Sequence, residues 1–265
     1  MTTIRKPFFV VPLDLGEIVC GNALSGNSVD NLGRHNAVAL TWKTNGNTNL
    51  WARGDFGSAQ PVDFMTLIQA NALPGTTIRL RLGSTQAEVD GIAPYDSGAL
   101  SLISPAITRD DGLYHSHLEI SSVQTYRWWR IDIGGHTGDF EASSLVLGTR
   151  IEPSRYYNFD FEYSVKDLGD LSFGRFGVFD ETPGAILRQV DFTLAWQSEA
   201  EFEASFRPMI EKLGRRGIVY CCFDPEATTY RQARTYMGVF DKPPFARGIR
   251  KPRTFQQDYA IVSLI

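Results

Sequence analysis

Short strand-like runs, separated by clusters of turn-forming residues, recur along most of the chain. The turns include Asn45-Gly46-Asn47, Pro74-Gly75 and Gly134-Gly135, and the 265 residues contain 24 glycines and 13 prolines. Many short strands joined by turns are typical of β-sandwiches and jelly rolls. We therefore predict a mainly β chain. The candidate strands are Phe8–Val11, Ala37–Trp42, Phe64–Gln69, Thr76–Leu82, His117–Ser121, Tyr126–Ile133, Ser144–Leu147, Tyr157–Tyr163, Leu171–Val178, Leu187–Ala195, Ile218–Phe223, Tyr236–Phe240 and Asp258–Leu264.

The clearest strand is Tyr126–Ile133. Because side chains alternate across a strand, Trp129 and Ile131 share one face, while Tyr126 and Trp128 share the other. The first face, which also carries Ile133, is predicted to point into a core. The second is amphipathic and carries two aromatic rings, so Tyr126 and Trp128 are candidate contacts with another domain or subunit.

The composition of the chain changes near residue 150, because five of the 17 phenylalanines precede it and twelve follow it. Ile151-Glu152-Pro153-Ser154 is the predicted boundary. We expect an N-terminal strand and loop over residues 1–36, a jelly roll over 37–150, and a β-rich assembly domain over 151–265.

One helix is predicted in the second half, over residues 199–213. Ser198 and Glu201 have the spacing of a capping box, and Gly214 is a typical C-terminal stop. The apolar residues recur at helical spacing, which predicts that one stripe packs on the C-terminal sheet. Pro208 interrupts the pattern and is expected to kink the helix. The predicted stripe is Phe202, Phe206, Met209, Ile210 and Leu213.

Charge and cysteine content limit the partners and compartments. The formal net charge is −4, which argues against general nucleic-acid binding. Three cysteines predict no disulfide framework and therefore a reducing compartment, with Cys221 and Cys222 as buried thiols. No apolar run approaches 18 residues and no targeting segment stands out, so membrane insertion is not expected. No cofactor is predicted.

Four histidines are the main candidates for site chemistry. His115-Ser116-His117 places two imidazoles near Asp110 and Asp111, which leaves open either a metal site or a solvated loop. Together with Tyr114, His115 and His117 are also the candidate contacts for a glycan. Nucleophile elbows, phosphate loops and zinc-protease motifs are missing, and adjacent acids cannot face each other across a glycosidic bond. We therefore expect no enzymatic activity.

The C-terminal region is unusually basic. Residues 231–265 contain seven basic residues and two acidic ones. Prolines and a glycine are expected to keep residues 242–253 out of a sheet over most of their length. Two interpretations remain open: a solvated loop, or an arm that docks on an acidic neighbouring subunit. The candidate contacts are Lys242, Arg247, Arg250, Lys251 and Arg253.

Residues 50–150 resemble the galactose-binding-like, or discoidin-like, jelly-roll family. The matching segments are Pro61–Leu73, Thr77–Leu82 and the strand Tyr126–Ile131. The resemblance implies a module of the type that binds sugars, without assigning binding residues.

Several segments together are similar to tail and baseplate proteins of long-tailed bacteriophages and prophages. They are Asp63–Leu82, Tyr95–Gly98, Trp128–Ile131, Leu145–Gly148, Arg188–Ala195, Ser198–Glu201 and Ile218–Pro225. This resemblance implies a structural component of the phage tail tip, made in the bacterial cytoplasm, that assembles as a homo-oligomeric ring and contacts other tail proteins. The alternative reading is a carbohydrate-binding module for host-surface glycans. A glycan-cleaving enzyme is the third reading, and it lacks a carboxylate constellation.

Overall fold

The computed structural model describes residues 5–248 and 252–265. The chain divides into two compact units. The jelly-roll unit comprises Phe9–Arg150 and Glu226–Arg234, and the helix unit comprises Met1–Phe8, Ile151–Pro225 and Thr235–Ile265. The segment 226–234 therefore leaves the helix unit and joins the jelly-roll unit.

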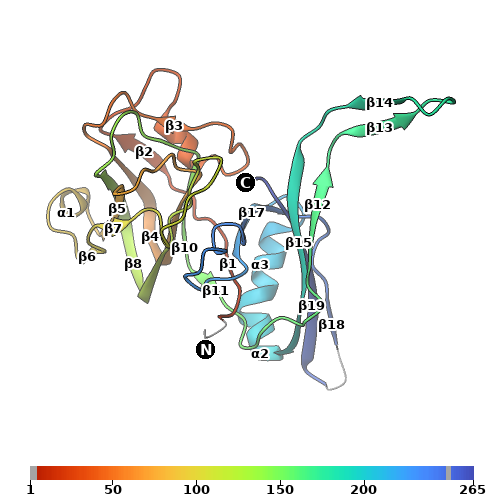
Figure 1. Ribbon diagram of the computed structural model, residues 1–265. Helices are drawn as coiled ribbons and strands as arrows, with labels where there is room; N and C mark the ends of the chain where they lie inside the picture. Colours follow the sequence, from red (N-terminus) through yellow and green to blue (C-terminus); the bar gives the residue numbers. More distant parts are fainter. Residues whose placement is uncertain (1–4, 249–251) are drawn as a thin grey trace. The chain divides into compact units, whose positions relative to one another are not determined.

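The jelly-roll unit is built on a seven-stranded sheet (Figure 1). Its strands follow the order β10-β4-β8-β5-β6, with β2 also paired to β4 and β7 to β5. Two short strands, β3 and β9, form a separate pair. The elements are β2 (Glu17–Cys20), a 3-10 helix (Val29–Gly33), β3 (Trp42–Lys43), β4 (Trp51–Ile68), β5 (Thr77–Gly83), α1 (Gln86–Asp90), β6 (Tyr95–Asp96), β7 (Leu100–Ser101), β8 (Leu118–Gly134), β9 (Glu141–Ala142) and β10 (Ser144–Gly148).

The central strands β4 and β8 are longer than the sequence pattern predicted. The two runs expected at 117–121 and 126–133 belong to one strand, β8, which pairs with β4 on both sides of a register shift between Val62 and Phe64. The strand predicted at 37–42 is wrong, since that region is mainly turns and β3 begins only at Trp42. Trp129, Ile131 and Ile133 are buried in the core, as the alternation predicted.

The helix unit contains an eight-stranded sheet in the order β11-β1-β16-β17-β19-β15-β12, with β18 paired to β19. The neighbours from β16 to β12 are antiparallel. β1 and β11 lie where the chain passes between the two units. The strands are β1 (Phe8–Val10), β11 (Arg150–Ile151), β12 (Glu162–Asp167), β13 (Asp170–Phe173), β14 (Phe179–Thr182), β15 (Ile186–Ser198), β16 (Val219–Cys222), β17 (Thr235–Phe240), β18 (Ala246–Gly248) and β19 (Thr254–Ser263).

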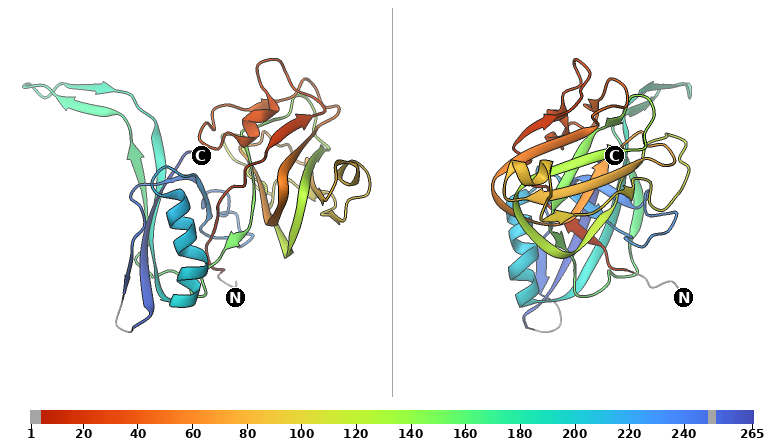
Figure 2. Two further views of the ribbon diagram at one scale, coloured as in Figure 1. Left: turned by 180° about the vertical axis from the view of Figure 1, so that it is seen from behind. Right: turned by 90° about the vertical axis from the view of Figure 1, so that its left-hand side faces the viewer.

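One helical segment, residues 199–213, lies along a face of this sheet (Figures 1 and 2). The Ser198 hydroxyl accepts a hydrogen bond from the Glu201 N–H, as the capping pattern predicted. The Glu201 carboxylate does not complete the box, because it accepts instead from the Ser154 N–H and hydroxyl at 2.8 and 2.6 Å. Of the predicted stripe, only Ile210 is partly exposed. The buried members are Phe202, Phe206, Met209 and Leu213.

The irregularity expected at Pro208 is a π-helical turn. The segment begins as α2 (Glu199–Glu201), widens into the π-helical turn Phe202–Phe206, and continues as α3 (Arg207–Leu213). The Arg207 N–H donates to the Phe202 carbonyl, five residues back. Widened turns are a recognised way of interrupting the regular ladder of an α-helix, and Pro208 has no N–H to offer that ladder. The helix therefore continues through the proline.

The fold class predicted from the sequence is confirmed: the chain is mainly β, with a jelly-roll unit and a second β-rich unit that carries one helix. Cys221 and Cys222 are buried, as expected, and burial raises the pKa of the Cys221 thiol. Among the described residues, no helix is both long and apolar enough to cross a membrane.

A largely buried imidazole makes the stability of the jelly-roll unit depend on pH. His35 lies 2.6 Å from the Ser144 hydroxyl, and burial lowers its pKa to about 4 from an ordinary value of 6.5. Between these values the unfolded chain binds a proton that the folded chain does not, so stability falls as the pH drops below 6.5.

We expect the lowered pKa of His35 to reduce the free energy of unfolding by about 2 kcal/mol between pH 7.5 and 4.5, a loss that a His35→Gln variant does not show. Urea unfolding of both proteins between pH 7.5 and 4.5 measures it, since titration of the carboxylates is common to both. Parallel stability curves for the two proteins would contradict the assignment.

Candidate functional site

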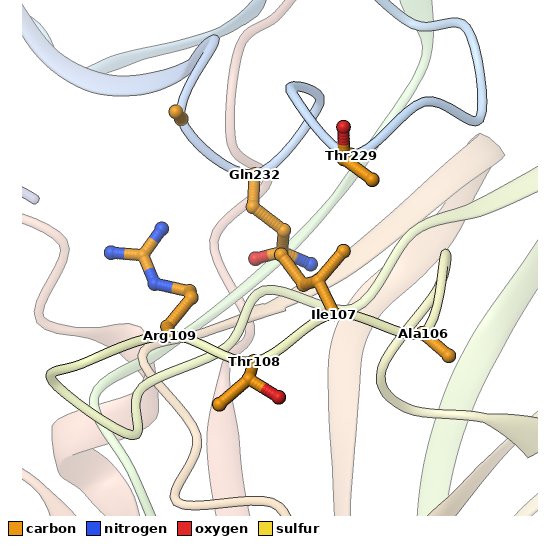
Figure 3. A pocket seen from close by; sticks show the side chains of 7 residues that line it. Ala106, Ile107, Thr108, Arg109, Thr229 and Gln232 are labelled. Atoms are coloured by element: carbon orange, nitrogen blue, oxygen red, sulfur yellow. The ribbon is translucent and has the colours of Figure 1, made fainter.

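Two loop segments of the jelly-roll unit border an open hollow of about 370 Å³ (Figure 3). One segment, residues 106–109, follows β7; the other, residues 229–233, comes from the stretch that returns from the helix unit. We call this cavity the loop hollow. Its lining combines small apolar groups with hydroxyl, amide and guanidinium groups. The lining residues are Ala106, Ile107, Thr108, Arg109, Thr229, Gln232 and Ala233.

Gln232 fixes the second segment, residues 229–233, against the backbone of His115. Its Oε1 accepts from the His115 N–H at 2.8 Å, and its Nε2 donates to the His115 carbonyl at 2.6 Å. Arg231 adds a second anchor, because its guanidinium donates to the carbonyl and the hydroxyl of Ser104. Both side chains are buried, so the hydrogen bonds are shielded from water. The loop hollow therefore has a preformed wall.

Arg109 is held at the edge of the loop hollow by Asp111. Its Nε and Nη2 donate to the two carboxylate oxygens at 3.0 and 2.5 Å. These hydrogen bonds lower the pKa of Asp111 to about 2, so the pair is ionised at neutral pH. The paired carboxylate balances the charge of the guanidinium, and the bonds to Asp111 leave the Nη1 hydrogens unused.

The structure places the three predicted glycan contacts in or near the core. Tyr114 and His115 are buried, and the Tyr114 hydroxyl accepts from the Arg109 N–H at 3.3 Å. His115 Nδ1 accepts from the Gln69 N–H at 3.1 Å. His117 Nε2 lies 2.8 Å from a Glu119 carboxylate oxygen. Tyr114 and His115 contact lining residues of the loop hollow from behind, His117 packs against Phe64, and the three side chains form no exposed platform.

The metal site that the sequence left open at His115 and His117 has no cluster of ligands among the described residues. Within residues 5–248 and 252–265, no group of three or more histidine, cysteine, aspartate or glutamate side chains is arranged to hold an ion. Asp110 and Asp111 belong to a turn, and His115 and His117 are engaged as described above.

The predicted interface residues lie in both units. Tyr126 and Trp128 are partly exposed on β8, with Arg127 near the Trp128 ring at 6.0 Å. Their contact with another domain or subunit stays a prediction.

Among the described residues of the basic segment only a short stretch is a strand, which agrees with the expectation that most of it stays out of a sheet. Residues 246–248 form β18 and pair with β19, because the prolines precede and follow this stretch. Arg247 and Arg253 are exposed and form ion pairs of 3.3 Å with Asp258 and Glu199. Lys242 is exposed in the loop before β18. Arg250 and Lys251 lie outside the described residues.

The residues that line the loop hollow were not among the sequence candidates. His115 and Gln232 are 117 positions apart, so no local pattern links them. The one local feature in the sequence is that Arg109 directly precedes two acidic residues, Asp110 and Asp111.

No known protein family matches the chain, and no curated protein is similar in sequence. Three solved structures resemble it in outline. They are a fucose-binding module from Streptococcus pneumoniae (5% identity, 52% of this chain and 95% of that one, TM-score 0.40), a CBM32 module of a family 31 glycoside hydrolase from Clostridium perfringens (10%, 52% and 96%, 0.41), and a fucolectin from striped bass (14%, 71% and 71%, 0.40).

These similar structures are modules of the carbohydrate-binding class. With TM-scores of about 0.4 the likeness is one of outline, and the fold assignment rests on the strand order of the chain itself. None of the three is named as a phage tail component, so the tail-tip reading stays a prediction.

Proposed function

We propose that the jelly-roll unit recognises a glycan, and that the loop hollow is its binding site. The observation that carries the proposal is the preformed hollow itself, with polar and apolar groups side by side on two anchored segments. Its volume is at the lower end of the range for small-ligand sites.

The lining suits a neutral sugar. A sugar ring presents hydroxyl groups at its edge and C–H groups on its faces, so it needs hydrogen-bonding groups beside apolar surface. Thr108, Thr229 and Arg109 supply the first, and the side chains of Ala106 and Ile107 supply the second. Because Asp111 already balances the Arg109 charge, an acidic sugar would gain little attraction here.

The chain is proposed to bind without cleaving. A glycosidase needs one carboxyl group that stays protonated near neutral pH, facing a second across the bond. At the loop hollow the opposite holds, since hydrogen bonds from Arg109 lower the pKa of Asp111.

A glycan array tests the proposal on the intact chain. We expect Ala106→Trp to weaken binding at least about tenfold, because an indole would fill the loop hollow. Ala87→Trp is the matched control, because Ala87 is also exposed but lies on α1 and does not line the loop hollow. Glycan binding by this variant should equal that of the unaltered chain. If the unaltered chain binds no glycan, or if both variants bind equally well, the proposal is wrong.

A second candidate function is a structural role in a phage tail tip, in which copies of the chain form a ring and contact other tail proteins. The exposed apolar side chains of the helix unit favour it. Phe173 is 71% and Phe176 is 90% exposed, and soluble monomers seldom leave such a group uncovered. Analytical ultracentrifugation tests this role: a defined oligomer supports it, and a monomer at tens of micromolar contradicts it.

A further inference from the structure

Another hollow, of about 200 Å³, lies within the helix unit, and we call it the sheet hollow. It is separate from the loop hollow, because every residue that lines it belongs to the helix unit. Three neighbouring strands, β17, β19 and β15, supply its apolar floor (Figure 1). The residues of this floor are Leu187, Val239 and Val262.

The register of the sheet brings the floor residues together. Val239 lies opposite Val262, and Val262 lies opposite Gln189. Leu187 precedes Gln189 by two positions, so the side chains of Leu187, Val239 and Val262 point to the same face of the sheet. Val262 is buried, whereas Leu187 and Val239 are partly exposed. The sheet therefore leaves an apolar surface that a ligand can cover.

Two cations and one anion surround this floor. Lys166 lies opposite Leu187, and its ammonium group donates to the Asp241 carboxylate. That hydrogen bond lowers the pKa of Asp241, so the pair is ionised at neutral pH and its two charges balance. Arg215 is exposed, and in the part of the chain that the structure describes no ion pair holds its guanidinium. One positive charge is therefore left over at the sheet hollow.

Nearby basic side chains add to this positive charge. Arg215 and Lys242 both lower the pKa of Asp241 through their charge, so both act at the sheet hollow. Lys212 and Arg216, at the end of the helix and just after it, are exposed as well. Clustered cations raise the local concentration of an anion. The surroundings of the sheet hollow therefore favour an anionic ligand.

Charge and floor together specify the class of ligand. A guanidinium binds a carboxylate through two parallel hydrogen bonds. The three floor side chains offer no hydrogen-bonding group, so they suit the hydrocarbon part of a ligand. The volume lies below the range of sites for drug-sized ligands, which limits that hydrocarbon part to a short chain or a single ring.

We propose that the sheet hollow binds a small monocarboxylate, whose carboxylate pairs with Arg215 and whose hydrocarbon part lies on the floor. A cation would be repelled here, a neutral molecule would leave Arg215 unused, and a polyanion without hydrocarbon would leave the floor uncovered. The inference uses no residue of the loop hollow, so it is independent of glycan recognition and of the structural role.

Titration of the intact chain with hexanoate tests the proposal. The methyl resonances of Leu187, Val239 and Val262 report binding, and we expect all three to shift and to reach saturation. 1-Hexanol has the same chain length without the charge, so it should bind at least about tenfold more weakly. Hexylammonium carries the opposite charge and should produce no saturable shift.

Charge substitutions test the role of each rim residue. Arg215→Gln should weaken hexanoate binding at least about tenfold. Arg216→Gln is the matched control, because it removes the same charge from the adjacent exposed position, which does not line the sheet hollow. Asp241→Asn should tighten binding at least about threefold, because it removes the anion and frees Lys166 for the ligand. Damage to the fold could not produce tighter binding.

Four results would overturn the proposal. They are the absence of a saturable shift at the floor methyl groups, equal binding of hexanoate and 1-hexanol, equal losses in the Arg215→Gln and Arg216→Gln variants, and unchanged or weaker binding by Asp241→Asn. The comparison of hexanoate with 1-hexanol uses the unaltered chain, so it decides the matter even where a variant fails to fold.

Discussion

Phe206→Ala is expected to lower the free energy of unfolding of the helix unit by about 3–5 kcal/mol. Phe206 is fully buried between the helix and the sheet, one turn after Phe202, whose ring stacks on Phe255 of β19 at 4.7 Å. Removing the ring loses its burial and leaves a cavity that the surrounding structure fills only in part.

Urea titration followed by far-UV circular dichroism measures this effect. Lys212→Ala is the matched control, because Lys212 is exposed on the same helix and should change stability by less than about 0.5 kcal/mol. A near-neutral Phe206→Ala variant would show that the stripe does not pack on the sheet.

Trp129→Ala is expected to destabilise the jelly-roll unit by a similar amount, about 3–5 kcal/mol. Trp129 is fully buried, and its indole N–H donates to the Leu15 carbonyl at 3.1 Å. The neighbouring strand makes room for it with Gly54, where an added Cβ would lie 2.6 Å from the indole. The variant therefore loses a large buried ring and leaves a carbonyl without its donor.

Trp128→Ala is the control for Trp129→Ala, because Trp128 is the adjacent residue on the opposite face of β8 and is only partly buried. We expect it to cost at most about 1 kcal/mol in the dilute chain. Thermal unfolding followed by circular dichroism compares the two. If Trp128→Ala proved the more damaging substitution, the assignment of the two faces would be reversed.

The candidate site shows where sequence reasoning ends. Of the histidines that the sequence pattern selected, His115 is buried and its backbone holds Gln232 of the proposed site, while His117 packs against Phe64 and Glu119. The exposed lining comes from residues 106–109 and from a segment more than a hundred positions later. Polar residues in loops carry no signal that distinguishes a buried support from an exposed contact, since that depends on which segments the fold brings together.

The sequence alone determined the mainly β class, the inward face of β8, and the start, end and apolar stripe of the helix over residues 199–213. These features follow from local periodicity and capping, which depend on residues only a few positions apart. Only the tertiary structure decided that β4 and β8 are long strands, that residues 226–234 join the jelly-roll unit, and that the paired strands β13 and β14 are left exposed. Such features depend on pairing and burial between distant segments, and local spacing does not encode them.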